Sequence, residues 1–101
     1  MHALVEARRP EIEALCRRLG VRRLDVFGSV VGSTFKESSD VDVLVEFDPS
    51  SLSARFDTYF ALKEGLERIL ERPVDVVTIT AIRNPYFLDE VMRNRENLYA
   101  A

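Results

Sequence analysis

Short valine-rich segments alternate with segments of helical periodicity along the chain, and this alternation limits the possible folds more than any other feature. The strand-like segments are residues 21–27, 41–47 and 73–79, each rich in Val, Leu or Phe. The helix-like segments are residues 9–19, 51–71 and 84–99, in which apolar side chains recur at helical spacing. Alternating helices and strands are typical of the α/β class, with a small sheet flanked by helices.

Length, charge and cysteine content narrow the class of protein further. With 101 residues the chain supports one hydrophobic core, which predicts a single domain over residues 1–101. The net charge of -3 argues against nucleic acid as the partner, because affinity for phosphate backbones comes from clustered Lys and Arg. The lone cysteine, Cys16, fits the apolar side of the first helix and is expected to be buried.

The sequence also indicates the cellular location of the protein. No apolar run approaches the roughly 20 residues that cross a bilayer. The first residues lack the apolar centre of a secretory signal. We therefore expect a cytoplasmic protein that does not enter the membrane.

Two aspartates, Asp40 and Asp42, stand at the start of the second strand-like segment. Side chains two residues apart on a strand point to the same face, so the two carboxylates are expected side by side, with Val41 facing the core. A divalent cation would relieve their repulsion, and an all-oxygen pair suits Mg²⁺. In the alternative interpretation the pair only solvates the end of a strand.

Asp75 is the only charged residue in the third strand-like segment, PVDVVTI. A carboxylate between Val74 and Val76 is costly inside a sheet unless it is paired or binds a metal. If the third strand neighbours the second, Asp75 joins Asp40 and Asp42 on one face as a third carboxylate. The alternative is an aspartate on an edge strand that faces water.

Gly28 and Ser29 follow the first strand-like segment directly. A glycine there lets the backbone turn sharply and approach a ligand closely. The serine that follows can begin a short helix, whose free N–H groups favour phosphate. The alternative is an ordinary turn with a helix N-cap, so the position of Gly28-Ser29 before the aspartate pair is what points to a phosphate site.

These motifs together carry a resemblance to a known family. The triplet FGS at residues 27–29, followed after ten residues by DVD at 40–42, with VDVVT at 74–78, resembles the nucleotidyltransferase fold of the DNA polymerase β superfamily, an α/β fold with a small mixed sheet flanked by helices. The small size and the RNPYF segment at 83–87 make the chain most similar to the minimal nucleotidyltransferase (MNT) proteins. Many of these are antitoxins paired with a HEPN-domain toxin.

The resemblance implies a role for each residue of the motifs. Gly28 and Ser29 would form the turn that contacts the nucleotide phosphates. Asp40 and Asp42 would bind Mg²⁺, and Asp75 would be the third carboxylate, a metal ligand that also helps to activate the acceptor hydroxyl. The site residues are thus expected to be catalytic and metal-binding at once.

One stretch departs from the family pattern. Many relatives carry an Arg-Gly pair where this chain has Gly32 and Ser33. Without this guanidinium the chain lacks a group that would hydrogen-bond the phosphate, although every expected metal ligand is retained. This difference bears on rate or nucleotide affinity.

The resemblance implies transfer of AMP from ATP to a tyrosine hydroxyl of a cognate HEPN toxin, with Mg²⁺ as cofactor and toxin and antitoxin in a hetero-oligomer. Two alternatives stay open. The chain could transfer a nucleotide to a small molecule such as an aminoglycoside, or it could be a non-catalytic antitoxin that acts by binding and occlusion. Whether ATP changes the mass of the partner distinguishes the last alternative from an enzyme.

Overall fold

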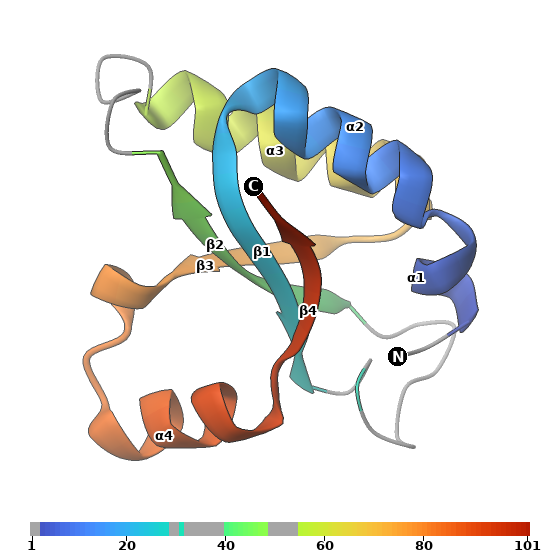
Figure 1. The fold of residues 1–101 in the computed structure, drawn as a ribbon. Helices are drawn as coiled ribbons and strands as arrows, with labels where there is room; N and C mark the ends of the chain where they lie inside the picture. Colours follow the sequence, from blue (N-terminus) through green and yellow to red (C-terminus); the bar gives the residue numbers. More distant parts are fainter. Residues whose placement is uncertain (1–2, 29–30, 32–39, 49–54) are drawn as a thin grey trace.

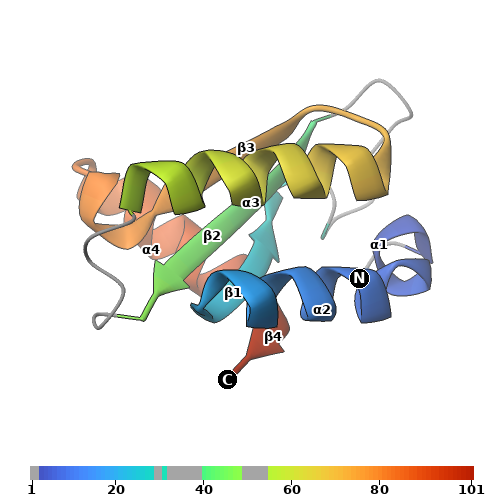
Figure 2. The ribbon, with the colours of Figure 1, turned by 90° about the horizontal axis from the view of Figure 1, so that it is seen from above.

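The structure is a computed structural model that describes residues 3–28, 31, 40–48 and 55–101. Its elements in chain order are α1 (Ala3–Ala7), α2 (Arg9–Leu19), β1 (Val21–Phe27), β2 (Val41–Phe47), α3 (Arg55–Leu70), β3 (Val74–Thr78), the 3-10 helix η3 (Ile79–Ala81), α4 (Pro85–Asn94) and β4 (Glu96–Ala100). The sheet lies between α2 and α3 on one face and α4 on the other (Figure 1, and seen from above in Figure 2). None of the helices described is long and apolar enough to cross a membrane.

The four strands form one mixed sheet in the order β3-β2-β1-β4. β1 is antiparallel to both of its neighbours, whereas β2 and β3 are parallel. A parallel pair needs a long connection that crosses over the sheet, and α3 supplies it. The predicted α/β class with a small mixed sheet and flanking helices is confirmed.

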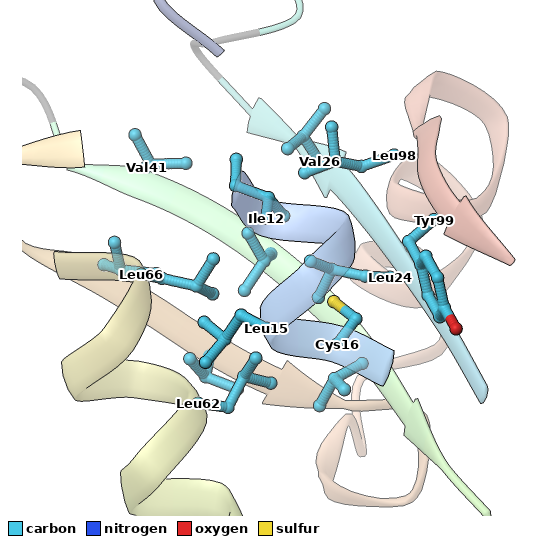
Figure 3. Close-up of a cluster of buried hydrophobic side chains, with 14 of the residues drawn as sticks. Ile12, Leu15, Cys16, Leu24, Val26, Val41, Leu62, Leu66, Leu98 and Tyr99 are labelled. Atoms are coloured by element: carbon cyan, nitrogen blue, oxygen red, sulfur yellow. The ribbon is translucent and has the colours of Figure 1, made fainter. Parts of the chain in front are cut away.

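The main core fills the space between the sheet and the α2–α3 layer (Figure 3). Alternate residues of β2 face this layer, so Val41, Val43 and Val45 are all buried. Gly65 lets the two helices pack closely, because a Cβ there would lie 2.7 Å from a methyl carbon of Leu15. Cys16 is buried in this core as predicted, and its burial raises the pKa of the thiol to about 12.

The helix α2 has the predicted bounds, and its ends follow from the sequence. A proline in the first turn lacks only an N–H group that a helix start leaves unpaired anyway. Gly20 ends the helix in the left-handed conformation, with φ of 70°. A residue without Cβ adopts that conformation at no steric cost.

The C-terminal segment differs from the single helix predicted over residues 84–99. The start is right: Asn84 caps α4 by accepting hydrogen bonds from the N–H groups of Tyr86 at 2.9 Å and Phe87 at 3.3 Å. However, α4 ends at Asn94, and β4 follows as an antiparallel neighbour of β1. Leu98, whose spacing suggested a helix, is buried as a strand residue, and so is Tyr99. The prediction was wrong here because pairing with β1 determines the conformation.

A buried carboxylate joins β4 to β1. The Asp25 side chain is only 1% exposed, and it accepts hydrogen bonds from Arg23 Nε at 3.0 and 3.2 Å. Arg95 Nη1, 3.2 Å away, and Asn97 Nδ2, 3.0 Å away, also donate to it. Because a buried charge is costly unless it is paired, this network favours the paired position of β4.

Candidate active site

Three strand ends meet at one end of the sheet. Phe27, the last residue of β1, is the pairing partner of Asp42, and Asp42 is level with Asp75 of β3. Paired residues on neighbouring strands project to the same face, so the carboxylates of Asp42 and Asp75 lie side by side. Asp40 is exposed and directly precedes β2. The structure therefore brings the three predicted aspartates to one place.

This group of aspartates lies on the face of the sheet that α4 covers. Leu44, two residues beyond Asp42 on the same face, packs in a second apolar cluster with Phe27 and with Val91 of α4. The ring of Phe87 meets that of Phe27 edge to face, with centroids 6.2 Å apart. A small apolar layer thus fixes α4 beside the carboxylates.

The electrostatics of the site centre on Asp42, which is half-buried. Burial raises the pKa of the Asp42 carboxyl first, and the negative charges of Asp75 and Asp40 raise it further. Both effects disfavour the charged form. The site is consequently one where a cation would be favourable.

Gly28 lies directly against this carboxylate. Its φ is +74°, and a Cβ placed on it would come within 2.5 Å of the Oδ2 atom of Asp42. Only a residue without a side chain fits both the backbone conformation and the space. The two ends of the loop between β1 and β2 thus meet at Asp42. Ser29, Gly32 and Ser33 lie outside the described residues.

The position of Asp75 combines the two alternatives read from the sequence. β3 is an edge strand rather than a central one, and Asp75 is exposed. It nonetheless neighbours Asp42, because β3 is paired in register with β2. The expected cost of burying this charge was wrong, since Asp75 is exposed, whereas Asp75 does lie level with Asp42 on the neighbouring strand.

The chemistry of the donors fits a hard divalent cation. Asp40, Asp42 and Asp75 offer carboxylate oxygens only, which suits Mg²⁺. Such an ion would relieve the mutual repulsion of the three carboxylates. Within the described parts of the chain, no three acidic, His or Cys side chains are arranged closely enough to form a complete metal-binding group. A bound ion would therefore need rotation of these side chains and oxygen atoms from water or substrate.

A separate cavity of about 580 Å³ opens at the other end of β2 and β3. Phe47, Phe60 and Ile79 are among the residues that line it. The aspartates stand at the amino ends of the same two strands, so this apolar cavity is not part of the candidate site.

Comparison with known proteins decides the family. The sequence profile of the nucleotidyltransferase domain matches residues 11–98. The chain belongs to the nucleotidyltransferase domain family. It is 42% identical over 72 residues to the protein adenylyltransferase MntA of Thermococcus cleftensis, a match that covers 69% of this chain and 68% of that one. The chain spans about two thirds of the length of the curated relatives that it matches, for example 65% and 68%.

Solved structures agree with this membership. A protein provisionally described as a minimal nucleotidyltransferase superposes with a TM-score of 0.75 and 34% identity, over 90% of this chain and 89% of that one. A complex of an MNT antitoxin with the tri-AMPylated HEPN toxin of Shewanella oneidensis gives a TM-score of 0.62 at 17% identity, over 96% of this chain and 73% of the matched one. The second likeness supports the fold alone. The predicted membership in the minimal nucleotidyltransferases is confirmed.

Proposed function

We propose that this nucleotidyltransferase moves AMP from ATP to a tyrosine hydroxyl of a cognate HEPN-domain toxin and thereby neutralises it. The observation that carries the proposal is the meeting of Gly28, Asp42 and Asp75 at three adjacent strand ends, with Asp40 beside them. The relative from Thermococcus cleftensis is named a protein adenylyltransferase. The Shewanella complex holds an antitoxin of similar fold with an AMPylated toxin.

The proposed reaction is an in-line displacement at the α-phosphorus of ATP. The tyrosine oxygen forms a bond to this phosphorus, the bond to the bridging oxygen of the β-phosphate breaks, and pyrophosphate leaves. Asp75 accepts the proton of the hydroxyl, which its exposure and its place beside Asp42 allow. Gly28 has no Cβ, so the Asp42 carboxylate can lie directly against the turn where the phosphates are proposed to bind.

The three aspartates would hold Mg²⁺. When bound, the ion would orient the phosphates and stabilise the negative charge that develops during the displacement. Asp42 is the central member of the three aspartates. It is level with Asp75 on the neighbouring strand, and one residue separates it from Asp40 along the chain. Occupation of the site would offset the repulsion that raises the pKa of Asp42.

Intact-mass spectrometry of the toxin tests this proposal. The proposed partner, a cognate HEPN protein, is incubated with this chain, ATP and Mg²⁺, and its mass is expected to rise by one or more AMP units. Peptide mapping should place the group on a tyrosine. An ATP analogue with an uncleavable α–β bridge, or removal of Mg²⁺ by a chelator, should abolish the change.

The result also separates an enzyme from a binding protein. If the toxin keeps its mass but is still neutralised in growth assays, the chain acts by occlusion and the proposed transfer is refuted. If the toxin is neither modified nor neutralised, the acceptor assignment is refuted. Modification of a small molecule such as an aminoglycoside would then become the hypothesis to test.

Replacing Gly28 by Ala is expected to lower the transfer rate by about 100-fold, since its Cβ displaces the Asp42 carboxylate from its position. The strain of a positive φ should also reduce stability by about 1–2 kcal/mol. Steady-state kinetics and urea unfolding measure the two effects separately.

Gly20→Ala is the matched control. Gly20 also has a positive φ, but it ends α2 and takes no part in the proposed site. The control should show a similar loss of stability with an unchanged transfer rate. Equal rates for the two variants would contradict the proposed contact between Gly28 and Asp42.

A further inference from the structure

The outer side of β3 presents backbone groups that no strand of the described residues pairs. Val41 donates its N–H to the carbonyl of Pro73 at 3.1 Å, so the groups of Pro73 and Asp75 face β2. Backbone groups alternate along a strand, and those of Val74 and Val76 therefore point away from the sheet. β3 is the edge strand, and such an edge normally bonds water or another chain.

Side chains of α3 take the place of the missing strand. Lys63 Nζ donates to the carbonyl of Val74 at 2.7 Å, and the N–H of Val74 donates to Glu67 Oε2 at 3.0 Å. The Tyr59 hydroxyl donates to the carbonyl of Val76 at 2.9 Å. Both backbone groups of Val74 and the carbonyl of Val76 are thus hydrogen-bonded to side chains of α3.

These three side chains form one row on the helix. Tyr59, Lys63 and Glu67 are spaced four residues apart, which places them on one face of α3. Lys63 and Glu67 also pair with each other at 3.2 Å. The hydrogen bond from Val74 and the bond from Lys63 lower the pKa of Glu67, so its charged, accepting form is favoured.

The residue between the two held valines is Asp75. Its own backbone faces β2, and the backbone on each side of it is fixed to α3. We propose that Tyr59, Lys63 and Glu67 are positioning residues that keep the Asp75 carboxylate level with Asp42 for nucleotidyl transfer. This inference rests on the proposed function. The row touches no substrate, because it acts on the backbone from the outer side of β3.

Glu67→Ala tests the row. Its kcat for AMP transfer is expected to fall about 10- to 100-fold, the usual loss when a group that orients a site residue is removed. Its KM for ATP should stay near the wild-type value, because the glycine turn lies at the end of β1. Glu67→Gln keeps an oxygen that can accept from Val74 and should restore most of the rate. Tyr59→Phe, which removes one bond, should have a smaller effect.

Hydrogen exchange gives a second readout that needs no activity. The amide of Asp75 faces β2, and it should exchange faster in Glu67→Ala than in the wild type, because β3 opens more often when its outer side is released. Glu64→Ala, an exposed charge on the same helix, should change neither exchange nor kcat. Leu19→Ala, which removes a partly buried apolar group from α2, should lower the melting temperature and leave kcat unchanged.

The outcomes separate this inference from the proposed function. If Glu67→Ala loses stability as Leu19→Ala does but keeps the wild-type kcat, the row is only structural and the inference is overturned. Unchanged exchange at Asp75 would overturn it as well. If the wild type transfers no AMP, the proposed function fails, and faster exchange at Asp75 still establishes that the row holds β3.

Discussion

Replacing Asp42 by Asn is expected to lower the rate of AMP transfer by about 1,000-fold while raising the melting temperature of the protein at neutral pH. The loss of rate follows from the position of Asp42 at the centre of the carboxylate group. The gain in stability follows from the removal of a charge that burial, Asp75 and Asp40 all disfavour. Toxin mass spectrometry with ATP and Mg²⁺ measures the rate, and thermal unfolding of the protein without Mg²⁺ measures the stability.

The pH dependence of stability determines whether Asp42→Asn raises or lowers the melting temperature. Because the pKa of Asp42 is raised in the folded protein, the folded state binds the proton more tightly than the unfolded state does. Stability is therefore lost as the pH rises through the interval between the two pKa values. Above that interval the ionised carboxylate destabilises the fold, and an amide of the same shape removes the cost. In acid, where Asp42 is neutral in both states, the stabilities of the two proteins should converge.

Glu46→Gln serves as the control for this experiment. Glu46 lies on the same strand, is exposed, and makes a long ion pair of 4.0 Å with Arg22. Neutralising it should leave the rate and the melting temperature unchanged. Full transfer by Asp42→Asn would refute the site assignment. An unchanged or lower melting temperature at neutral pH would refute the proposed destabilisation by the Asp42 charge, independently of the transfer rate.

The sequence predicts well the elements that carry a complete local pattern. In α2, apolar spacing, a proline in the first turn and a final glycine all indicate the same helix, and its bounds are as predicted. β1 and β2 are likewise strands over the predicted residues, because valine-rich segments bounded by turn residues favour a strand in any context. β3 is shorter than predicted, spanning Val74–Thr78.

Long-range pairing accounts for the elements that the sequence did not predict. Residues 96–100 form a strand because β1 has a free side, where buried Asp25 meets Arg95 and Asn97. No local pattern carries that information. The short helix α1 was also not predicted, since one turn lacks a measurable period and is stabilised by burial of Val5.

The sequence predicts which residues form the candidate site, and that assignment stays a prediction, but it does not predict their environment. The spacing of Asp40 and Asp42 and the lone charge at Asp75 place three carboxylates on one face once β2 and β3 are neighbours. The edge position of β3 depends on sheet order, which these motifs do not contain. The contact of Gly28 with Asp42 depends on the same assembly, although a glycine after a strand had indicated a close approach.

Replacing Asp25 by Ala is expected to destabilise the protein by about 3 kcal/mol or more, since it removes the buried partner shared by Arg23, Arg95 and Asn97. These three side chains would lose their acceptor at the junction of β1 and β4, and a cavity would remain. Urea unfolding at neutral pH measures the loss. Asp25→Asn, which keeps the shape and one acceptor oxygen but replaces the other oxygen with an NH2 donor and loses the charge, should fall between Ala and the wild type.

Asp89→Ala provides a matched control, because Asp89 also pairs with an arginine, Arg93, but on the exposed surface of α4. An exposed pair one helical turn apart contributes little, so this control should lose no more than about 0.5 kcal/mol. The contrast isolates burial as the cause, since both variants delete one aspartate that faces arginine. Equal losses in the two variants would show that the Asp25 network does not hold β4 in place, and the position of β4 would then be attributed to its pairing with β1 and to the burial of Leu98 and Tyr99.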